Sequence, residues 1–202
     1  QNETSIGYSF NPEEIKNIRE NNPEKIIALD LVSAVPSIPV DLSQIDTAYF
    51  SVQKCFGLPA GMGIWIVGPK CFEVSKAKAS KNEIVGSYHS LAALKKNGDK
   101  NQTPETPNVL NLYLLKNVLK DMQFKGISSI QNETKYKAAL LYQTFDQITE
   151  LKTVIPYPLN RSKTVCVSEV HGGNKGLIEY LKSKQLIIGS GYGAFKDQHI
   201  RI

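Results

Sequence analysis

Lys54 stands where an amine could do covalent chemistry. It follows an expected strand over residues 46–52 and comes directly before a loop rich in Gly and Pro. The run after that loop, residues 62–67, is apolar and predicts a buried strand. A free ammonium ion is costly to bury between two apolar strands. The position therefore favours an amine in covalent use, as in a Schiff base with an aldehyde cofactor.

Asp30 ends another expected strand, residues 25–31, upstream of Lys54. Open α/β sheets bind ligands at the carboxyl ends of their strands, so an acid there faces the binding crevice. Pyridoxal phosphate needs an amine for its aldehyde and a carboxylate for its pyridine nitrogen. Asp30 and Lys54 together suggest a site for this cofactor, and both are expected to be catalytic.

The residues around this pair resemble the class V aminotransferases, and among them most resemble the phosphoserine aminotransferases. The pattern is an Asp and Ser after a strand, a Pro-Val-Asp stretch, then Gln-Lys and a Gly- and Pro-rich turn. It is carried by Asp30, Ser33, Pro39-Val40-Asp41, Gln53-Lys54, Gly57 and Pro59-Ala60-Gly61. Further similar segments are Asn2-Glu3-Thr4, Gln102-Thr103-Pro104-Glu105-Thr106 and His199-Ile200-Arg201. Their order extends the resemblance over nearly the whole chain.

The resemblance implies a role for each matched residue. The implied cofactor-binding residues are Thr4, Asp30, Ser33, Gln53, Lys54, Gln102 and Thr103. Thr103 is expected to reach the cofactor phosphate of the neighbouring subunit, which implies a homodimer with shared active sites. Arg201 is expected to hold the substrate carboxylate and His89 to reach the substrate phosphate. The chain departs from the family at Gln102, where the family has Asn, and at Glu105, where it has a second Pro.

An enzyme of this kind would be a transaminase that moves an amino group between an amino acid and a 2-oxo acid. The phosphoserine branch implies O-phospho-L-serine and glutamate as amino donors, in serine biosynthesis. An alanine–glyoxylate or serine–pyruvate type of class V aminotransferase is the alternative, and a non-catalytic homologue that serves as an interaction module is a second one. A cysteine desulfurase is disfavoured because Gln53, rather than His, precedes Lys54.

Composition bounds these interpretations. The 202 residues are 41% hydrophobic and 21% charged, which is typical of a globular protein, and no apolar run approaches the ~20 residues of a membrane span. The net charge of +5 includes a lysine-rich stretch, residues 70–100, without the aromatic interleaving or arginine stripe of a nucleic-acid site. Three widely spaced cysteines match no metal-binding pattern and favour a reducing, cytoplasmic compartment.

The elements that would position these residues predict an α/β protein. The resemblance implies the fold-type I architecture of pyridoxal phosphate-dependent transferases. We expect part of its large mixed-sheet domain over residues 1–120 and a small C-terminal α+β domain over residues 121–202. Because family members are roughly twice as long, the chain is expected to be a C-terminal portion of a longer polypeptide. Residues 70–107 predict a long functional loop.

Helical periodicity begins at residue 108, and Gly126 is expected to break it before a second helix of residues 128–151. In the C-terminal domain we expect strands at 164–170, 186–188 and 198–202, and a helix at 175–184. The Gly-rich run 189–193 is a weak candidate for a phosphate loop, because no Lys-Ser or Lys-Thr pair follows it.

Overall fold

The computed structural model describes residues 1–83 and 90–202, and these form two compact units. The first unit comprises Gln1–Ile15, Ser33–Val40 and Met122–Ile202. The second unit comprises Lys16–Val32 and Asp41–Asp121. The break after Asp121 lies beside the domain boundary expected near residue 120, but two N-terminal segments group with the C-terminal residues. The division into domains at residues 120 and 121 stays a prediction.

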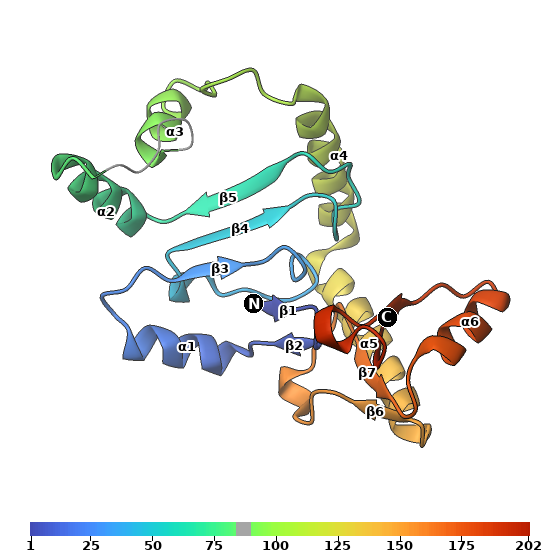
Figure 1. The fold of residues 1–202 in the computed structure, drawn as a ribbon. Helices are drawn as coiled ribbons and strands as arrows, with labels where there is room; N and C mark the ends of the chain where they lie inside the picture. The colour runs from blue at the N-terminus through green and yellow to red at the C-terminus, as the bar shows by residue number, and fades with distance from the viewer. Residues whose placement is uncertain (84–89) are drawn as a thin grey trace. The chain divides into compact units, whose positions relative to one another are not determined.

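The second unit is built on a three-stranded sheet in the order β3-β4-β5, seen side by side in Figure 1. The strands are β3 (Ala28–Asp30), β4 (Thr47–Ser51) and β5 (Gly63–Val67), each shorter than the sequence predicts. β3 pairs parallel with β4, and β4 pairs antiparallel with β5. The register aligns Asp30 with Tyr49 and Tyr49 with Trp65. Paired residues project from the same face of a sheet, so these three side chains share one face.

Helices occupy the stretch that the sequence assigns to a long loop. α2 (Pro69–Ser80) and α3 (Leu91–Gly98) both lie within residues 70–107, so that prediction was wrong. Pro69 opens α2 at a position where its missing N–H costs nothing, and the Ser90 hydroxyl caps α3 by accepting from the Ala93 amide at 3.2 Å. Both helices are rich in Ala and Lys, which have favourable helix propensity.

The first unit combines a short hairpin, a long helix and an antiparallel sheet. The hairpin is β1 (Asn2–Glu3) with β2 (Tyr8–Ser9), and α5 spans Ile127–Gln147. The sheet has the order β6-β7-β9-β8, with β6 (Leu151–Thr153), β7 (Val167–Val170), β8 (Gly189–Ser190) and β9 (His199–Arg201). Elsewhere in residues 1–83 and 90–202 the helices are α1 (Pro12–Asn21), α4 (Val109–Lys125) and α6 (Lys175–Ser183), with short 3₁₀ helices at Leu42–Gln44, Pro158–Asn160 and Gly193–Phe195.

One apolar cluster holds the first unit together. Its buried members come from α5 and the sheet, and side chains of α6 pack against them: Ala138, Tyr142, Phe145, Cys166, Val170 and Ile200, with Leu177 and Ile178. The Tyr142 hydroxyl donates to the Ser162 carbonyl oxygen at 2.8 Å, which satisfies the one polar atom of that buried ring. This sheet with helices is the α+β arrangement that the C-terminal sequence predicts.

The fold class is confirmed as mixed α/β, and the helix break is confirmed at Gly126, whose φ is +87°. The strand expected at residues 186–188 lies instead at Gly189–Ser190, and β6 and the β1–β2 hairpin were missed. A Cβ on Gly191 would lie 1.9 Å from the Phe195 carbonyl oxygen. Close backbone packing therefore accounts for a glycine in the run that was considered as a phosphate loop.

Candidate functional site

Lys54 lies on a turn that directly follows β4. Buried residues on both sides of Lys54 anchor this turn. Val52, Phe56 and Leu58 are buried, and the Leu58 amide donates to the Val52 carbonyl oxygen at 3.1 Å. The Phe56 ring stacks on Phe50 of β4 with centroids 5.0 Å apart. Lys54 itself is exposed, so the expectation of a lysine buried between strands was wrong. The turn is held by its apolar neighbours while the amine points to open space.

The backbone after Lys54 reverses through a glycine. The Gly57 amide donates to the Lys54 carbonyl oxygen at 3.0 Å, and Gly57 has a φ of +65°, which a residue with a side chain rarely adopts. The Lys54 ammonium makes no hydrogen bond or ion pair with any other residue among 1–83 and 90–202. It is therefore an uncommitted amine on an ordered turn.

Asp30 is the last residue of β3, which pairs in parallel with β4. Its Oδ1 accepts from the Val32 amide at 2.8 Å, and its Oδ2 accepts from the Tyr49 hydroxyl at 3.1 Å. Because parallel strands end at the same edge of a sheet, Asp30 and the turn that bears Lys54 follow strand ends on one edge. A carboxylate and a free amine at one edge suit a cofactor with a pyridine nitrogen and an aldehyde, so the donor set fits pyridoxal phosphate.

The segment of residues 103–107 lies beside the loop that follows Lys54. Residues 61–64 and residues 103–108 line one pocket of about 400 Å³ within the second unit. The Thr103 hydroxyl donates to the Glu105 carbonyl oxygen at 2.5 Å, so it must rotate before it can donate to a phosphate. Gln53 and Gln102 are both exposed, and their amides are accessible to a ligand.

Ser33 is tied to two distant segments of the first unit. The Asn2 amide donates to Ser33 Oγ at 3.1 Å and to Thr164 Oγ1 at 3.0 Å. Thr164 Oγ1 in turn donates to the Ser33 carbonyl oxygen at 2.6 Å. Thr4 lies half-buried in the turn of the β1–β2 hairpin. That hairpin packs closely on β7, since a Cβ on Gly7 would lie 2.8 Å from a methyl of Val167.

Arg201 lies on β9, and one edge of its guanidinium forms a hydrogen bond within the first unit. Its Nε donates to the Ser190 carbonyl oxygen at 2.8 Å, and its guanidinium carbon lies 5.7 Å from the Tyr192 ring centroid. Within residues 1–83 and 90–202, no carboxylate forms an ion pair with it. The two contacts orient the guanidinium, and its outer N–H groups suit a carboxylate ligand.

The family model for class V aminotransferases matches residues 1–195. The chain belongs to the class V aminotransferase family. It is 30% identical over 165 residues to a phosphoserine aminotransferase of Rhodococcus opacus, a match that covers 81% of this chain and 43% of that protein. A solved phosphoserine aminotransferase of Cytophaga hutchinsonii is 37% identical, with a TM-score of 0.93, and matches 100% of this chain and 56% of its own.

Other solved aminotransferases share this fold at lower identity, and these matches confirm the expected fold-type I architecture. An alanine–glyoxylate aminotransferase of Nostoc has a TM-score of 0.83 at 19% identity, covering 98% of this chain and 53% of that one. Such a likeness shows the fold alone. The chain spans about half the length of the relatives it matches.

The predicted site residues of this family member fall into two groups. Asp30, Gln53, Lys54, Gln102 and Thr103 belong to the second unit, and Thr4, Ser33 and Arg201 belong to the first. His89 lies outside the described residues. The hydrogen bonds described above for these residues lie within one unit or the other. The catalytic and binding roles of the residues stay predictions. Among residues 1–83 and 90–202, no cluster of side chains could hold a metal ion, and no helix is long and apolar enough to cross a membrane.

Sequence reasoning missed Tyr49 and Thr164, which contact Asp30 and Ser33. Tyr49 could have been found by aligning the two expected strands in parallel, because Asp30 then faces it. Thr164 gave no signal, because it follows Ser33 by well over a hundred residues with no motif around it.

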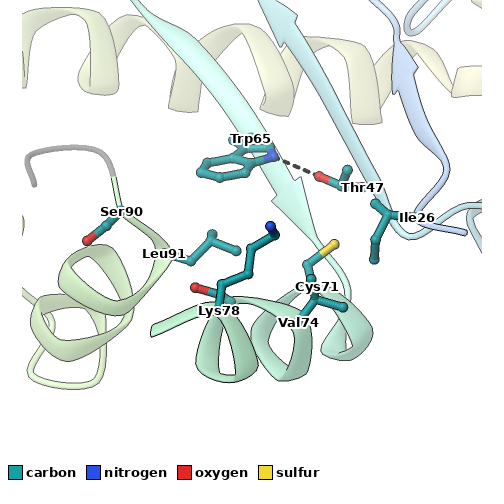
Figure 2. Close-up of a pocket in the computed structure, with 9 residues that line it drawn as sticks. Ile26, Thr47, Trp65, Cys71, Val74, Lys78, Ser90 and Leu91 are labelled. Atoms are coloured by element: carbon teal, nitrogen blue, oxygen red, sulfur yellow. Dashed lines mark hydrogen bonds between the residues drawn. The ribbon is translucent and has the colours of Figure 1, made fainter. Parts of the chain in front are cut away.

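The second unit also has an apolar pocket of about 300 Å³ that the sequence did not indicate. Trp65 of β5 and Cys71, Val74 and Lys78 of α2 point into it (Figure 2). The Trp65 indole N–H donates to Thr47 Oγ1 at 2.7 Å, which fixes the ring on the sheet face. Burial raises the pKa of the Cys71 thiol, so this cysteine is protonated and unreactive at neutral pH.

Proposed function

We propose that this protein is a pyridoxal phosphate-dependent aminotransferase and that Lys54 carries the cofactor. The observation that carries the proposal is the exposed Lys54 amine on an anchored turn after β4, with Asp30 closing the parallel strand beside it. Membership of the class V aminotransferases supports both the activity and the cofactor.

When bound, pyridoxal phosphate supplies an aldehyde and an electron-withdrawing ring that eases removal of the proton from the substrate α-carbon. Lys54 Nζ would hold the cofactor through its aldehyde, and once released it would serve as the base that takes the proton from the substrate α-carbon and returns it. The Asp30 carboxylate would accept a hydrogen bond from the pyridine N–H and so keep that nitrogen protonated. The Arg201 guanidinium binds the substrate α-carboxylate, which amino donor and 2-oxo acid have in common.

The substrates we propose are O-phospho-L-serine and glutamate with their 2-oxo acids, in serine biosynthesis. The relatives at 30% and 37% identity, named as phosphoserine aminotransferases, support this choice. His89 remains the proposed contact for the substrate phosphate. Cys71 and Cys166 are free thiols, which supports a reducing compartment such as the cytoplasm.

We further propose a homodimer in which Thr103 and Gln102 reach the partner's cofactor phosphate. The two prolines at 104 and 107 stiffen this exposed segment, so it can project across an interface. Mixing a Lys54→Ala variant with a variant disrupted at residues 102–103 should restore activity, because one composite site then carries neither lesion. No recovery after verified subunit exchange would argue against a shared site.

Covalent trapping tests the cofactor assignment. The protein that carries this sequence is incubated with pyridoxal phosphate, treated with borohydride and digested. We expect a single modified peptide bearing the cofactor mass on Lys54. A protein that binds no cofactor would instead support the non-catalytic alternative.

Turnover then tests the substrate. O-phospho-L-serine with 2-oxoglutarate is compared with L-alanine or L-serine with glyoxylate or pyruvate. A kcat/KM at least about tenfold higher for phosphoserine is expected, since a bound phosphate adds charge-assisted contacts. Preference for alanine and glyoxylate would assign the chain to the other branch.

A further inference from the structure

The Tyr49 hydroxyl donates a hydrogen bond to the Asp30 carboxylate. The two residues are partners in the parallel register of β3 and β4, and Tyr49 OH lies 3.1 Å from Asp30 Oδ2. The Leu31 amide donates to the Tyr49 carbonyl oxygen at 2.9 Å, so the backbone pairing continues past Asp30. Leu31 is 1% exposed, which anchors the end of β3.

The carboxylate is held through both of its oxygens. Oδ1 accepts from the Val32 amide at 2.8 Å while Oδ2 accepts from Tyr49. A backbone donor on one side and a phenol on the other restrict rotation about the bond to the carboxylate. The Val32 bond is local to the end of β3, whereas the Tyr49 bond ties Asp30 to the strand that leads into the Lys54 turn.

Packing alone does not account for the position of Tyr49. Its side chain is 45% exposed on the sheet face that it shares with Trp65. The adjacent Trp65 is fixed by Thr47 rather than by Asp30. Donation to Asp30, together with the carboxylate charge, raises the pKa of Tyr49, so the phenol stays a proton donor across the neutral range.

We propose that Tyr49 is a positioning residue that aims the Asp30 carboxylate at the pyridine nitrogen of the cofactor. The proposal rests on the proposed function, in which Asp30 meets that nitrogen. By joining the end of β3 to the middle of β4, the Tyr49–Asp30 bond also keeps the carboxylate in a constant relation to the strand that precedes Lys54. Tyr49 touches no reacting atom in this proposal and acts only through Asp30.

A double-mutant cycle tests this in the protein that carries the sequence. The forms compared are the parent, Tyr49→Phe, Asp30→Asn and the double variant, with Tyr113→Phe as the matched control. Tyr113 is a phenol of the same unit, 63% exposed on α4, and no described contact joins its side chain to Asp30. The readouts are the Kd for pyridoxal phosphate, the pH midpoint of its visible absorbance on the protein, and the Tm without cofactor.

Tyr49→Phe should weaken cofactor binding by roughly 3- to 10-fold, less than for a fully buried bond to a charged group because Tyr49 is half exposed. It should also shift the pH midpoint, with the cofactor-free Tm unchanged and Tyr113→Phe equal to the parent. In the Asp30→Asn background the same substitution should change Kd by less than about twofold, because the two losses are not independent.

Three results would overturn the proposal, and they differ from one another. If Asp30→Asn weakens binding but Tyr49→Phe does not, Tyr49 has no positioning role while the proposed function stands. If Tyr49→Phe acts equally in both backgrounds, or lowers the Tm, it works through the fold instead of through Asp30. If Asp30→Asn itself leaves Kd and absorbance unchanged, Asp30 is not the pyridine partner, and the proposed function loses its second catalytic residue.

Discussion

The two main sheets of the chain differ in how much of their surface other elements cover. In the first unit, Ile200 of β9 is 2% exposed and packs with α5 and α6, while Val167 of β7 is 1% exposed against the β1–β2 hairpin. In the second unit, Tyr49 and Trp65 of the central and edge strands are each 45% exposed. The covered sheet is mainly a core, whereas the open sheet presents Asp30 and the Lys54 turn to a ligand. Substitutions should therefore affect chemistry in one unit and stability in the other.

Lys54→Ala should give the largest effect and leave stability untouched. Transamination should fall by more than about 1000-fold, because in the proposed function the amine both holds the cofactor and moves the proton. The Tm should stay within about 1 °C, since Lys54 is exposed and makes no described contact. Lys54→Arg keeps the charge and should be equally inactive. Near-normal turnover with cofactor bound would end the assignment.

Phe145→Ala should show the opposite pattern in the first unit. Phe145 is 2% exposed and packs edge-to-face with Tyr142 at 6.0 Å between centroids. Truncating a buried aromatic ring costs about 3–5 kcal/mol, measured as the free energy of unfolding in urea. Phe124→Ala is the matched control, because that ring is 96% exposed and its loss should cost under about 0.5 kcal/mol. Equal losses at the two positions would contradict the contrast between covered core and exposed surface.

Arg201→Ala should be an exception to this division between chemistry and stability. Arg201 is a proposed substrate contact, but it lies on β9 in the covered sheet of the first unit. Losing a bidentate, charge-assisted contact should lower kcat/KM by roughly 30- to 1000-fold for amino donor and 2-oxo acid alike. Preference for phosphoserine over serine should change little, since the proposed phosphate contact is His89 rather than Arg201. Arg201→Lys should recover only part of the activity because it lacks the planar fork. An effect confined to one half-reaction would show that Arg201 is not the shared carboxylate clamp.

His199 should make the stability of the first unit weakly dependent on pH. It is 5% exposed, stacks on Phe195 at 4.6 Å, and its buried Nδ1 has no hydrogen-bond partner among the described residues. Burial lowers the pKa of His199, although the Glu169 carboxylate opposite it works to raise that pKa. The folded pKa thus lies below the ordinary value of about 6.5 for an unfolded chain.

Stability from His199 is therefore complete above about pH 6.5 and is lost as the pH falls through the folded pKa. Urea titrations at pH 7.5 and pH 5.5 should show a loss smaller than that of Phe145→Ala. His199→Gln should reduce this pH dependence, while His171→Gln, at an exposed position, should leave it unchanged. A pH dependence that survives His199→Gln would place its origin elsewhere.

Local patterns in the sequence were enough to predict several elements. Apolar runs predict β4 and β5, and their lengths were overestimated by only one or two residues. The 3.6-residue period predicts α4 and α5, and Gly126 marks the break because it adopts a positive φ. Lys54 and Asp30 were recognisable because an ionisable residue at the end of an apolar strand is unusual whatever the rest of the fold does.

Tertiary structure decided what depends on contacts between distant residues. α2 and α3 were missed because they lack an apolar stripe, although their Ala and Lys content and the cap at Ser90 were readable. The exposure of Lys54 follows from burial of Val52, Phe56 and Leu58, which carry the turn in its place. The pairing of Tyr49 with Asp30 depends on the register of two strands, and that of Thr164 with Ser33 on folding of the first unit. Neither contact exists until distant backbone segments have packed, so no local pattern in the sequence encodes it.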